Sequence, residues 1–346
     1  MTGNMTAVVK TAPAPGSEVG QVPVPRLGLR DVLVKVKAAS ICGTDLHIQD
    51  WDKWAQGRIR PPLVFGHEFC GEVVERGEDA TTVALGTFVS VEGHVVDGTC
   101  FQCRTGNAHI CENVAIVGVD RPGCFAEYVA VPEANVYAMG PGISPEVAAI
   151  QDPFGNAVHT TLSGEVAGLT VAVVGSGPIG CCAVAVARAS GAQAVFATDI
   201  RPFRLGLARR MGADRVIDST KEDPVAVVKG ETGGQGADVV LEMSGHGEGV
   251  KQAFKMLRRG GRLSLLGIPS QPVTLDLAED VVFKGVTVLG INGRRMWKTW
   301  YQAQALLRSG KVDLTPLITH TFPLREIHKG MALLEDGQAA KVILYP

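Results

Sequence analysis

Hydrophobic and polar residues follow two different rhythms along the 346-residue chain. From residue 1 to about 150, short apolar runs such as 32–36 and 72–75 are separated by Gly, Pro and long irregular stretches. From about residue 165, apolar runs at 170–174 and 194–198 flank a Gly-rich turn and a helical pattern over 178–190. The first rhythm predicts a loop-rich β domain, and the second predicts a parallel sheet with helices on both faces.

Further strands expected at 237–243, 262–266 and 286–290 continue the parallel sheet. The predicted fold class is therefore α/β, with a doubly wound parallel sheet beside a loop-rich β domain. We expect the first domain at residues 1–150, the doubly wound domain at 151–294, and a C-terminal segment at 295–346 that returns to the first domain.

The composition is that of an ordinary globular protein, with 46% hydrophobic residues, 20% charged residues and a formal net charge of -2. Such a charge, without a basic block, gives no reason to expect nucleic acid or an anionic membrane as a partner. No apolar run reaches the length of about 18 residues that a membrane span needs, and the start lacks a signal-peptide core. We therefore expect a cytoplasmic protein whose eight cysteines are thiols or metal ligands rather than disulfides.

The sequence GSGPIG at 175–180 follows a predicted strand and opens a predicted helix. In that context the three glycines, Gly175, Gly177 and Gly180, allow a tight turn and a close approach of a pyrophosphate to the helix N-terminus. Asp199 ends the next strand, where its carboxylate can accept hydrogen bonds from ribose hydroxyls and repel a 2'-phosphate. The motif predicts NAD as cofactor, although Arg201 or Arg204 could attract a 2'-phosphate, contact the adenine face or stay solvated.

Cys42, His67 and Glu68 supply a thiolate, an imidazole and a carboxylate, which are the ligand types of a catalytic zinc with an open position. Each residue alone fits a structural role better, as a small buried thiol, a core histidine or a surface acid. Their combination upstream of a dinucleotide motif favours the metal site.

Cys100, Cys103 and Cys111 have the tight spacing of a structural zinc site. An empty lobe or one closed by a disulfide remains an alternative. A nucleic-acid zinc ribbon is disfavoured, because the neighbouring residues lack a basic and aromatic surface. The other four cysteines lie in apolar or helical contexts that indicate packing.

The segments CGTDLH at 42–47 and GHE at 66–68, together with the dinucleotide motif, resemble the zinc-containing medium-chain alcohol dehydrogenase family over essentially the whole chain. The resemblance implies a GroES-like first domain and a Rossmann second domain. It also implies that Cys42 and His67 are firm zinc ligands and that Glu68 is an exchangeable one. Thr44 and His47 would relay the substrate proton. Asp152 stands where the family has an acidic group near the metal, either as a ligand or as a proton relay.

The same resemblance implies further contacts. Members carry a fourth cysteine where this chain has Asp97, whose carboxylate can complete a tetrahedral site with Cys100, Cys103 and Cys111. Two zinc ions per subunit are therefore expected. The family commonly forms homotetramers through its nucleotide domains. The implied cofactor contacts outside the glycines are Ile179, Asp199, Arg204, Leu266, Gly267, Ile268, Ile291 and Asn292.

Segments 50–54, 119–128, 152–160 and 293–301 look like those of the family members that oxidise L-threonine. The implied reaction is NAD-linked oxidation of L-threonine to 2-amino-3-oxobutanoate. A polyol or a vicinal diol such as 2,3-butanediol is the alternative substrate within the family. A non-catalytic dinucleotide-binding protein is a remote alternative, because it would have no reason to keep the full set of metal and relay residues.

Overall fold

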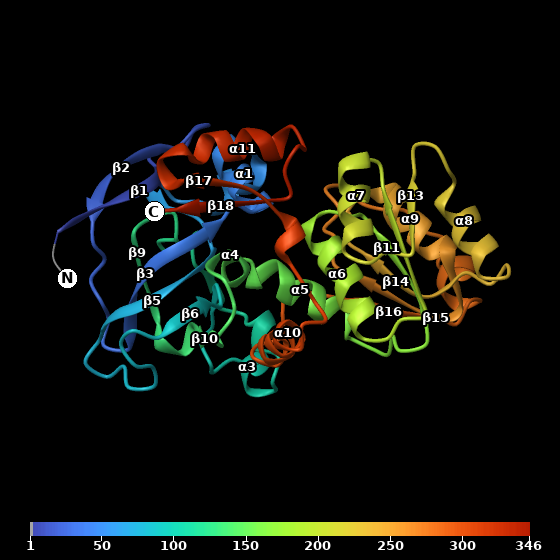
Figure 1. The fold of residues 1–346 in the computed structure, drawn as a ribbon, viewed down its shortest axis with the longest axis horizontal. Helices are drawn as coiled ribbons and strands as arrows, with labels where there is room; N and C mark the ends of the chain where they lie inside the picture. Colours follow the sequence, from blue (N-terminus) through green and yellow to red (C-terminus); the bar gives the residue numbers. More distant parts are fainter. Residues whose placement is uncertain (1–2) are drawn as a thin grey trace. The chain divides into compact units, whose positions relative to one another are not determined.

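The computed structural model describes residues 3–346. The chain forms two compact units, one built from residues up to Asp152 together with Ile318–Pro346, and the other from Pro153–Leu317 (Figure 1). Each unit has a sheet and a hydrophobic core of its own.

The first unit contains a seven-stranded sheet in the order β10-β6-β5-β3-β18-β17, with β9 also paired to β3. Its strands are β3 (Asp31–Ser40), β5 (Glu68–Arg76), β6 (Phe88–Val91), β9 (Tyr128–Pro132), β10 (Val136–Ala138), β17 (Ile318–Pro323) and β18 (Lys341–Tyr345). A smaller sheet has the order β2-β1-β4, with β1 (Asn4–Lys10), β2 (Glu18–Pro23) and β4 (Leu63–Val64). β7 (His94–Val95) pairs with β8 (Ala115–Ile116).

Short helices connect these strands: α1 (Gly43–Asp50), α2 (Lys53–Arg58), α3 (Phe101–Arg104), α4 (Pro145–Ala149) and α11 (Ile327–Glu335). The core of the unit is formed by aliphatic side chains of β3, β5 and β18 around the edge-to-face pair Phe65 and Phe125, whose ring centroids are 5.2 Å apart. Aromatic pairs in this geometry add to the free energy gained by burial.

The second unit is a six-stranded parallel sheet in the order β13-β12-β11-β14-β15-β16. Its strands are β11 (Thr170–Val174), β12 (Ala194–Asp199), β13 (Arg215–Asp218), β14 (Ala237–Glu242), β15 (Leu257–Leu265) and β16 (Thr287–Gly290). The order reverses at β11 and β14, which is the topological switch point where open α/β sheets bind ligands.

Helices cover both faces of this sheet, with α6 and α7 together on one side and α8 and α9 on the other (Figure 1). Their bounds are α6 (Pro178–Ala189), α7 (Pro202–Arg210), α8 (Pro224–Glu231) and α9 (Gly247–Met256). Because both faces are covered, β11 is a nearly continuous buried apolar run, TVAVV. The predicted α/β class with a doubly wound sheet is confirmed.

The limits of the units differ in detail from the expected ones. α10 (Lys298–Arg308) lies within the second unit, and the chain rejoins the first unit at Ile318 rather than near residue 295. The first border falls inside α5 (Gln151–Thr161), a continuous helix that hydrophobic periodicity cannot divide. Within residues 3–346, none of the helices has the length and apolar character required to cross a bilayer.

Candidate functional site: a nucleotide cavity and two metal clusters

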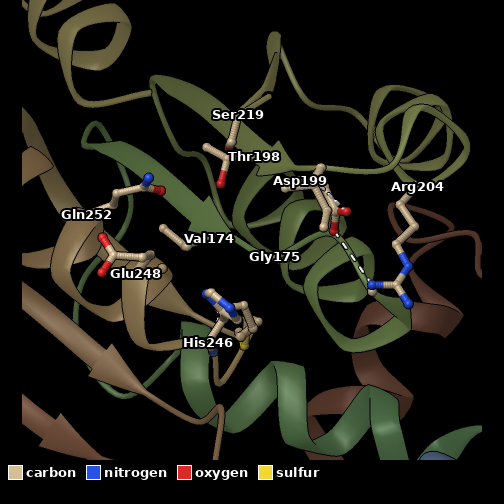
Figure 2. A pocket seen from close by; sticks show the side chains of 14 residues that line it. Val174, Gly175, Thr198, Asp199, Arg204, Ser219, His246, Glu248 and Gln252 are labelled. Carbon is tan, nitrogen blue, oxygen red and sulfur yellow. Dashed lines mark hydrogen bonds and ion pairs between the residues drawn. The ribbon is translucent and has the colours of Figure 1, made fainter. Parts of the chain in front are cut away.

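A cavity of about 430 Å³ lies at the switch point of the parallel sheet. Its walls come from the carboxyl ends of β11, β12 and β14 and from the start of α9, as Figure 2 shows. Of the residues predicted to bind the cofactor, Gly175, Gly177, Asp199 and Arg204 line it. The cavity therefore has the location and the acidic residue expected for the adenosine half of a dinucleotide.

The turn between β11 and α6 depends on close backbone approaches. Gly175 has a φ of +91°, a conformation that favours glycine. A Cβ on Gly180 would lie 1.9 Å from the carbonyl oxygen of Gly175, so a larger residue would force the helix away from the strand. Pro178 occupies the first turn of α6, and its fixed φ suits that position.

Asp199 is held at the end of β12 by backbone donors. Its Oδ2 accepts a hydrogen bond from the Ser176 N–H at 2.8 Å, and its Oδ1 accepts from the N–H groups of Ile200 and Arg201 at 2.8 and 2.9 Å. The Arg204 guanidinium lies 3.9 Å from Oδ2. The carboxylate is therefore fixed in place with lone pairs still available, and it faces a partly exposed cation.

The remaining predicted cofactor positions lie at the ends of neighbouring elements. Ile179 is in the first turn of α6, while Ile291 and Asn292 follow β16. Leu266 and Gly267 follow β15, where their N–H groups donate to the carbonyl oxygen of buried Glu242. Ile268 is 90% exposed. The cavity is also lined by six polar residues that the sequence does not predict as cofactor contacts: Thr198, Ser219, Ser244, His246, Glu248 and Gln252.

A first metal-type cluster forms in the other unit. Cys42 precedes α1, His67 directly precedes β5, and Glu68 is the first residue of β5. One ligand atom from each of the three lies within 4.8 Å of the others. His67 and Glu68 are buried, so their polar atoms need partners that water cannot supply.

The electrostatics of this cluster favour a cation. Burial alone would lower the pKa of His67, but Cys42 and Asp45 outweigh it and raise that pKa to about 10. Asp45 is fully buried, its own pKa is raised to about 6 chiefly by burial, and its Oδ1 lies 3.7 Å from Nδ1 of His67. Neither of these two atoms has a hydrogen-bond partner. A thiol, an imidazole and a carboxylate backed by a second carboxylate match the ligand set of zinc.

Lys341, on β18, also lies in this cluster. The spacing of residues in the sequence does not predict this contact. Its buried ammonium donates hydrogen bonds to Glu68 Oε2 at 2.5 Å and to the carbonyl oxygen of Ile41 at 3.0 Å. Burial opposes the charge, but Glu68 and then Cys42 outweigh it, so the pKa of Lys341 is raised. Glu68 therefore has a competing cationic partner, which is consistent with an exchangeable ligand.

Two of the three predicted relay residues lie close to this cluster, and the third, His47, is on the same helix as Thr44. Thr44 is on α1 with its Oγ1 4.0 Å from Cys42 Sγ, and His47 is in the last turn of the same helix. Asp152 is in α5 and is close enough for its charge to raise the pKa of His67. Asp152 is outside the three-residue group whose ligand atoms converge.

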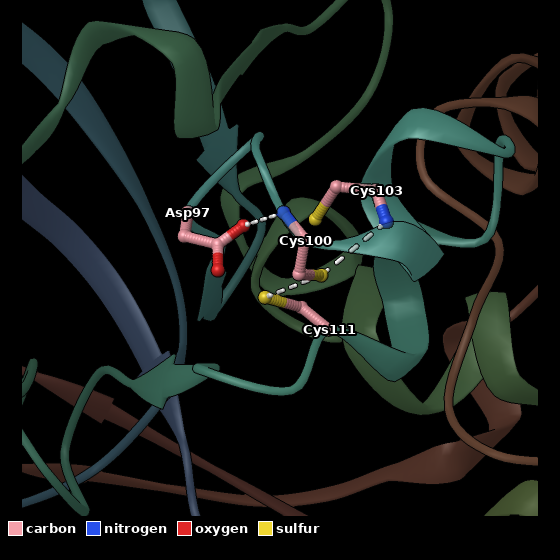
Figure 3. Close-up of side chains that lie close together, drawn as sticks. All are labelled: Asp97, Cys100, Cys103 and Cys111. Carbon is pink, nitrogen blue, oxygen red and sulfur yellow. Dashed lines mark hydrogen bonds between the residues drawn. The ribbon is translucent and has the colours of Figure 1, made fainter.

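The second metal-type cluster consists of Asp97, Cys100, Cys103 and Cys111, whose ligand atoms also lie within 4.8 Å of one another (Figure 3). Asp97 Oδ1 accepts hydrogen bonds from the Thr99 and Cys100 N–H groups, and Oδ2 accepts from Asn113 Nδ2 at 2.6 Å. The three cysteines are free thiols, with Sγ of Cys100 and Cys111 3.8 Å apart.

The pKa values of Cys100 and Cys103 are shifted in opposite directions. The N–H of Cys103 lowers the pKa of Cys100, whereas burial and the adjacent thiols raise the pKa of Cys103 to about 12. The carboxyl of Asp97, which accepts from Asn113 and two backbone N–H groups, has a pKa below its ordinary value. This donor set fits a tetrahedral zinc with three sulfur ligands and one oxygen ligand.

Comparisons with known proteins agree with this architecture. Residues 28–141 match the alcohol dehydrogenase GroES-like domain, and residues 178–309 match the zinc-binding dehydrogenase family. The chain is 52% identical over 346 residues to an L-threonine 3-dehydrogenase of Bacillus licheniformis, with all of both chains covered.

Solved structures give the same result. A zinc-binding dehydrogenase from Sinorhizobium meliloti 1021, bound to NADP, superposes with a TM-score of 0.91 at 30% identity, covering 99% of this chain and 100% of that one. The 2R,3R-butanediol dehydrogenase of Bacillus subtilis superposes with a TM-score of 0.89 at 28% identity, covering 99% of each chain.

Proposed function

Because the chain belongs to the zinc-binding alcohol dehydrogenase family, we propose that it oxidises L-threonine with NAD to 2-amino-3-oxobutanoate. NAD would accept the hydride that C3 of threonine loses, and the hydroxyl proton would be released, so the products would be the ketone, NADH and one proton. The full-length identity of 52% to an L-threonine 3-dehydrogenase is the observation that carries the choice of substrate.

Cys42, His67 and Glu68 would hold the catalytic zinc, whose Lewis acidity lowers the pKa of a bound substrate hydroxyl. Asp45 would stabilise the positive charge at His67 electrostatically, because its Oδ1 lies 3.7 Å from Nδ1 of the imidazole. Lys341 neutralises Glu68 when that carboxylate does not serve as a ligand.

Thr44 and His47 would carry the substrate proton to solvent. The Thr44 hydroxyl is near the Cys42 thiol, and His47 is half exposed at the end of the same helix. The imidazole can accept a proton on one nitrogen while releasing one from the other. Asp152 would be a further relay group, because its charge contributes to the raised pKa of His67 although its carboxylate is outside the three-ligand cluster.

Asp199 supports NAD rather than NADP as the cofactor. The cofactor would supply the hydride acceptor. Its carboxylate is fixed by three backbone N–H groups, so it cannot turn away from a 2'-phosphate without losing them. The relative that binds NADP is 30% identical, which leaves room for a different nucleotide preference. A catalytic efficiency with NADP equal to that with NAD would refute this part of the proposal.

The deciding assay follows NADH formation with L-threonine, sorbitol and 2,3-butanediol as substrates. The proposal expects the highest kcat/KM for L-threonine. A preference for the diol is the outcome that would favour the second candidate, since a butanediol dehydrogenase shares the fold with a TM-score of 0.89.

Two variants test the metal assignment. Cys42→Ser should lose the catalytic zinc and nearly all turnover, because it removes the thiolate from a three-residue ligand set. Cys70→Ser is the matched control, since that buried thiol donates to the Pro145 carbonyl oxygen and lies outside both metal clusters. Equal zinc content in both variants would contradict the assignment.

The second zinc would be held by Asp97, Cys100, Cys103 and Cys111 and would stabilise the lobe around α3. We also infer a homotetramer assembled through the nucleotide-binding units. β16 is the edge strand of the parallel sheet, and Ile268, Leu277, Val282 and Phe283 in the same part of the chain are all exposed. Light scattering of the purified protein tests this state.

A cytoplasmic location is supported by the eight free cysteines, since cytosolic reductants keep metal-binding thiols reduced. Cell fractionation with an antibody to the chain tests it.

A further inference from the structure

We propose that Asp52 is a positioning residue that fixes the imidazole of His47 with Nε2 as its proton acceptor. This inference rests on the proposed function, in which His47 relays the substrate proton. The carboxylate Oδ2 of Asp52 lies 2.7 Å from Nδ1 of His47, which is a short, charge-assisted hydrogen bond.

The direction of this hydrogen bond follows from the chemistry of its partners. Oδ1 of Asp52 accepts from the N–H of Ala55 at 3.0 Å, because Asp52 is the N-cap of α2. That hydrogen bond is the main reason why the pKa of Asp52 lies below its ordinary value. An ionised carboxylate can only accept, so Nδ1 of His47 must donate, and a neutral imidazole then has its lone pair on Nε2.

The backbone between the two residues is built to bring them together. Trp51 adopts the left-handed conformation, with φ of 56° and ψ of 44°, and is the sole non-glycine residue with a positive φ among residues 3–346. This reverses the chain between α1 and α2. Two contacts stabilise that conformation. The Lys10 ammonium lies 5.1 Å from the centroid of the Trp51 ring, and Gln56 donates a hydrogen bond to the Trp51 carbonyl oxygen.

The imidazole is also bounded by an aromatic ring. Trp54, in the first turn of α2, has its ring centroid 6.2 Å from that of His47. The His47 side chain is 59% exposed, so water competes with the Asp52 hydrogen bond. The expected effect is therefore that of an ordinary hydrogen bond, roughly a three- to tenfold change in rate, rather than the much larger effect of a buried carboxylate and histidine pair.

Asp52→Asn is the direct test because asparagine is as good an N-cap as aspartate. With its oxygen on the Ala55 N–H, its amide group would donate to Nδ1 of His47 and force the proton onto Nε2. Asp223→Asn is the matched control: Asp223 is the N-cap of α8 and accepts from the Val225 N–H at 2.9 Å. This control makes the same substitution at the start of a helix, but at a residue for which no hydrogen bond to a histidine is seen among residues 3–346.

We expect Asp52→Asn to lower kcat roughly three- to tenfold with an unchanged KM for NAD, and Asp223→Asn to change neither. Added imidazole buffer should restore part of the lost rate, which a purely structural defect would not allow. In a His47→Ala background, Asp52→Asn should have no further effect, because Asp52 acts through His47. Wild-type kcat in Asp52→Asn, or an equal loss in both backgrounds, would overturn the proposal.

The rate ratios are taken on whichever alcohol the wild-type protein oxidises best, so a failure of threonine as substrate is separate from a failure of this inference. Nitrogen-15 chemical shifts of His47 in labelled protein report the tautomer without turnover. A wild-type shift pattern with the proton on Nε2 would also overturn the proposal.

Discussion

Replacing Lys341 with methionine tests how the buried ion pair with Glu68 contributes to stability. Methionine keeps most of the length of the side chain but removes the charge, which leaves the Glu68 carboxylate, whose side chain is 1% exposed, without its cation. At the observed N···O distance of 2.5 Å, the attraction is worth about 7 kcal/mol at an effective dielectric constant of about 20. Desolvation of both ions offsets part of this, and breaking such a pair costs about 3 to 5 kcal/mol.

The control is Lys10→Met, which removes another fully buried lysine from the same unit. Lys10 donates to the carbonyl oxygens of Gly16 and Gln49 and lies over the Trp51 ring, so its loss leaves neutral groups at these contacts. We expect a loss of about 1 to 3 kcal/mol there. Urea denaturation of the metal-free proteins, followed by circular dichroism, gives the free energies of unfolding.

A Glu68→Gln and Lys341→Met double variant completes the cycle. It should lose less stability than the sum of the two single changes, because neither charge remains unpaired. Zinc should stabilise Lys341→Met more than wild type, since the cation replaces the missing ammonium. Additive losses in the cycle, or a loss for Lys341→Met no larger than that for Lys10→Met, would refute the reasoning.

Three further predictions concern the metal and nucleotide sites. The pKa of His67 in the metal-free protein is about 10, against an ordinary 6.5, so the imidazole is protonated at pH 7.5. Zinc binding should therefore release this proton, and zinc affinity should rise with pH. Calorimetry in buffers of different ionisation enthalpy measures the proton release, and pH-independent zinc binding would contradict the prediction. By elemental analysis, Asp97→Ala should lower the zinc content from two atoms per chain to one. Asp79→Ala is the control and should not lower it, because Asp79 is exposed and outside both clusters. Two zinc atoms in Asp97→Ala would exclude Asp97 as an essential ligand. Asp199→Ala should raise the KM for NAD about tenfold or more and reduce the preference for NAD over NADP, because it removes charged hydrogen-bond acceptors. An unchanged ratio of the kcat/KM values for NAD and NADP would count against a role of Asp199 in cofactor selection.

The elements that could be predicted from the sequence are those defined by short spacing. β11 was expected at 170–174 and is found there, and the glycine turn and Asp199 follow within the same strand–helix–strand unit. The four residues of the cysteine lobe lie between positions 97 and 111, so their convergence needs only local turns. The roles assigned to these residues remain predictions.

Interactions between residues close together in the chain can also escape sequence analysis. Asp52 is five residues from His47, yet their hydrogen bond depends on the left-handed conformation of Trp51. A tryptophan rarely adopts that conformation, so no pattern of residue types indicated it. The sequence likewise shows Asp45 only as one residue of the 42–47 motif. Its complete burial beside His67 follows from the tertiary packing around β5.

The contact between Lys341 and Glu68, 273 residues apart, was decided by tertiary structure alone. β18 pairs with β3, placing Ile343 opposite Ser40, and β3 pairs with β5, placing Ser40 opposite Glu68. Sequence determined the fold class and the residue types at both metal clusters, because local spacing and hydrophobic periodicity encode them. The register of three strands determined which charge faces Glu68, because hydrogen-bonded pairing between distant segments leaves no periodic signal in either segment.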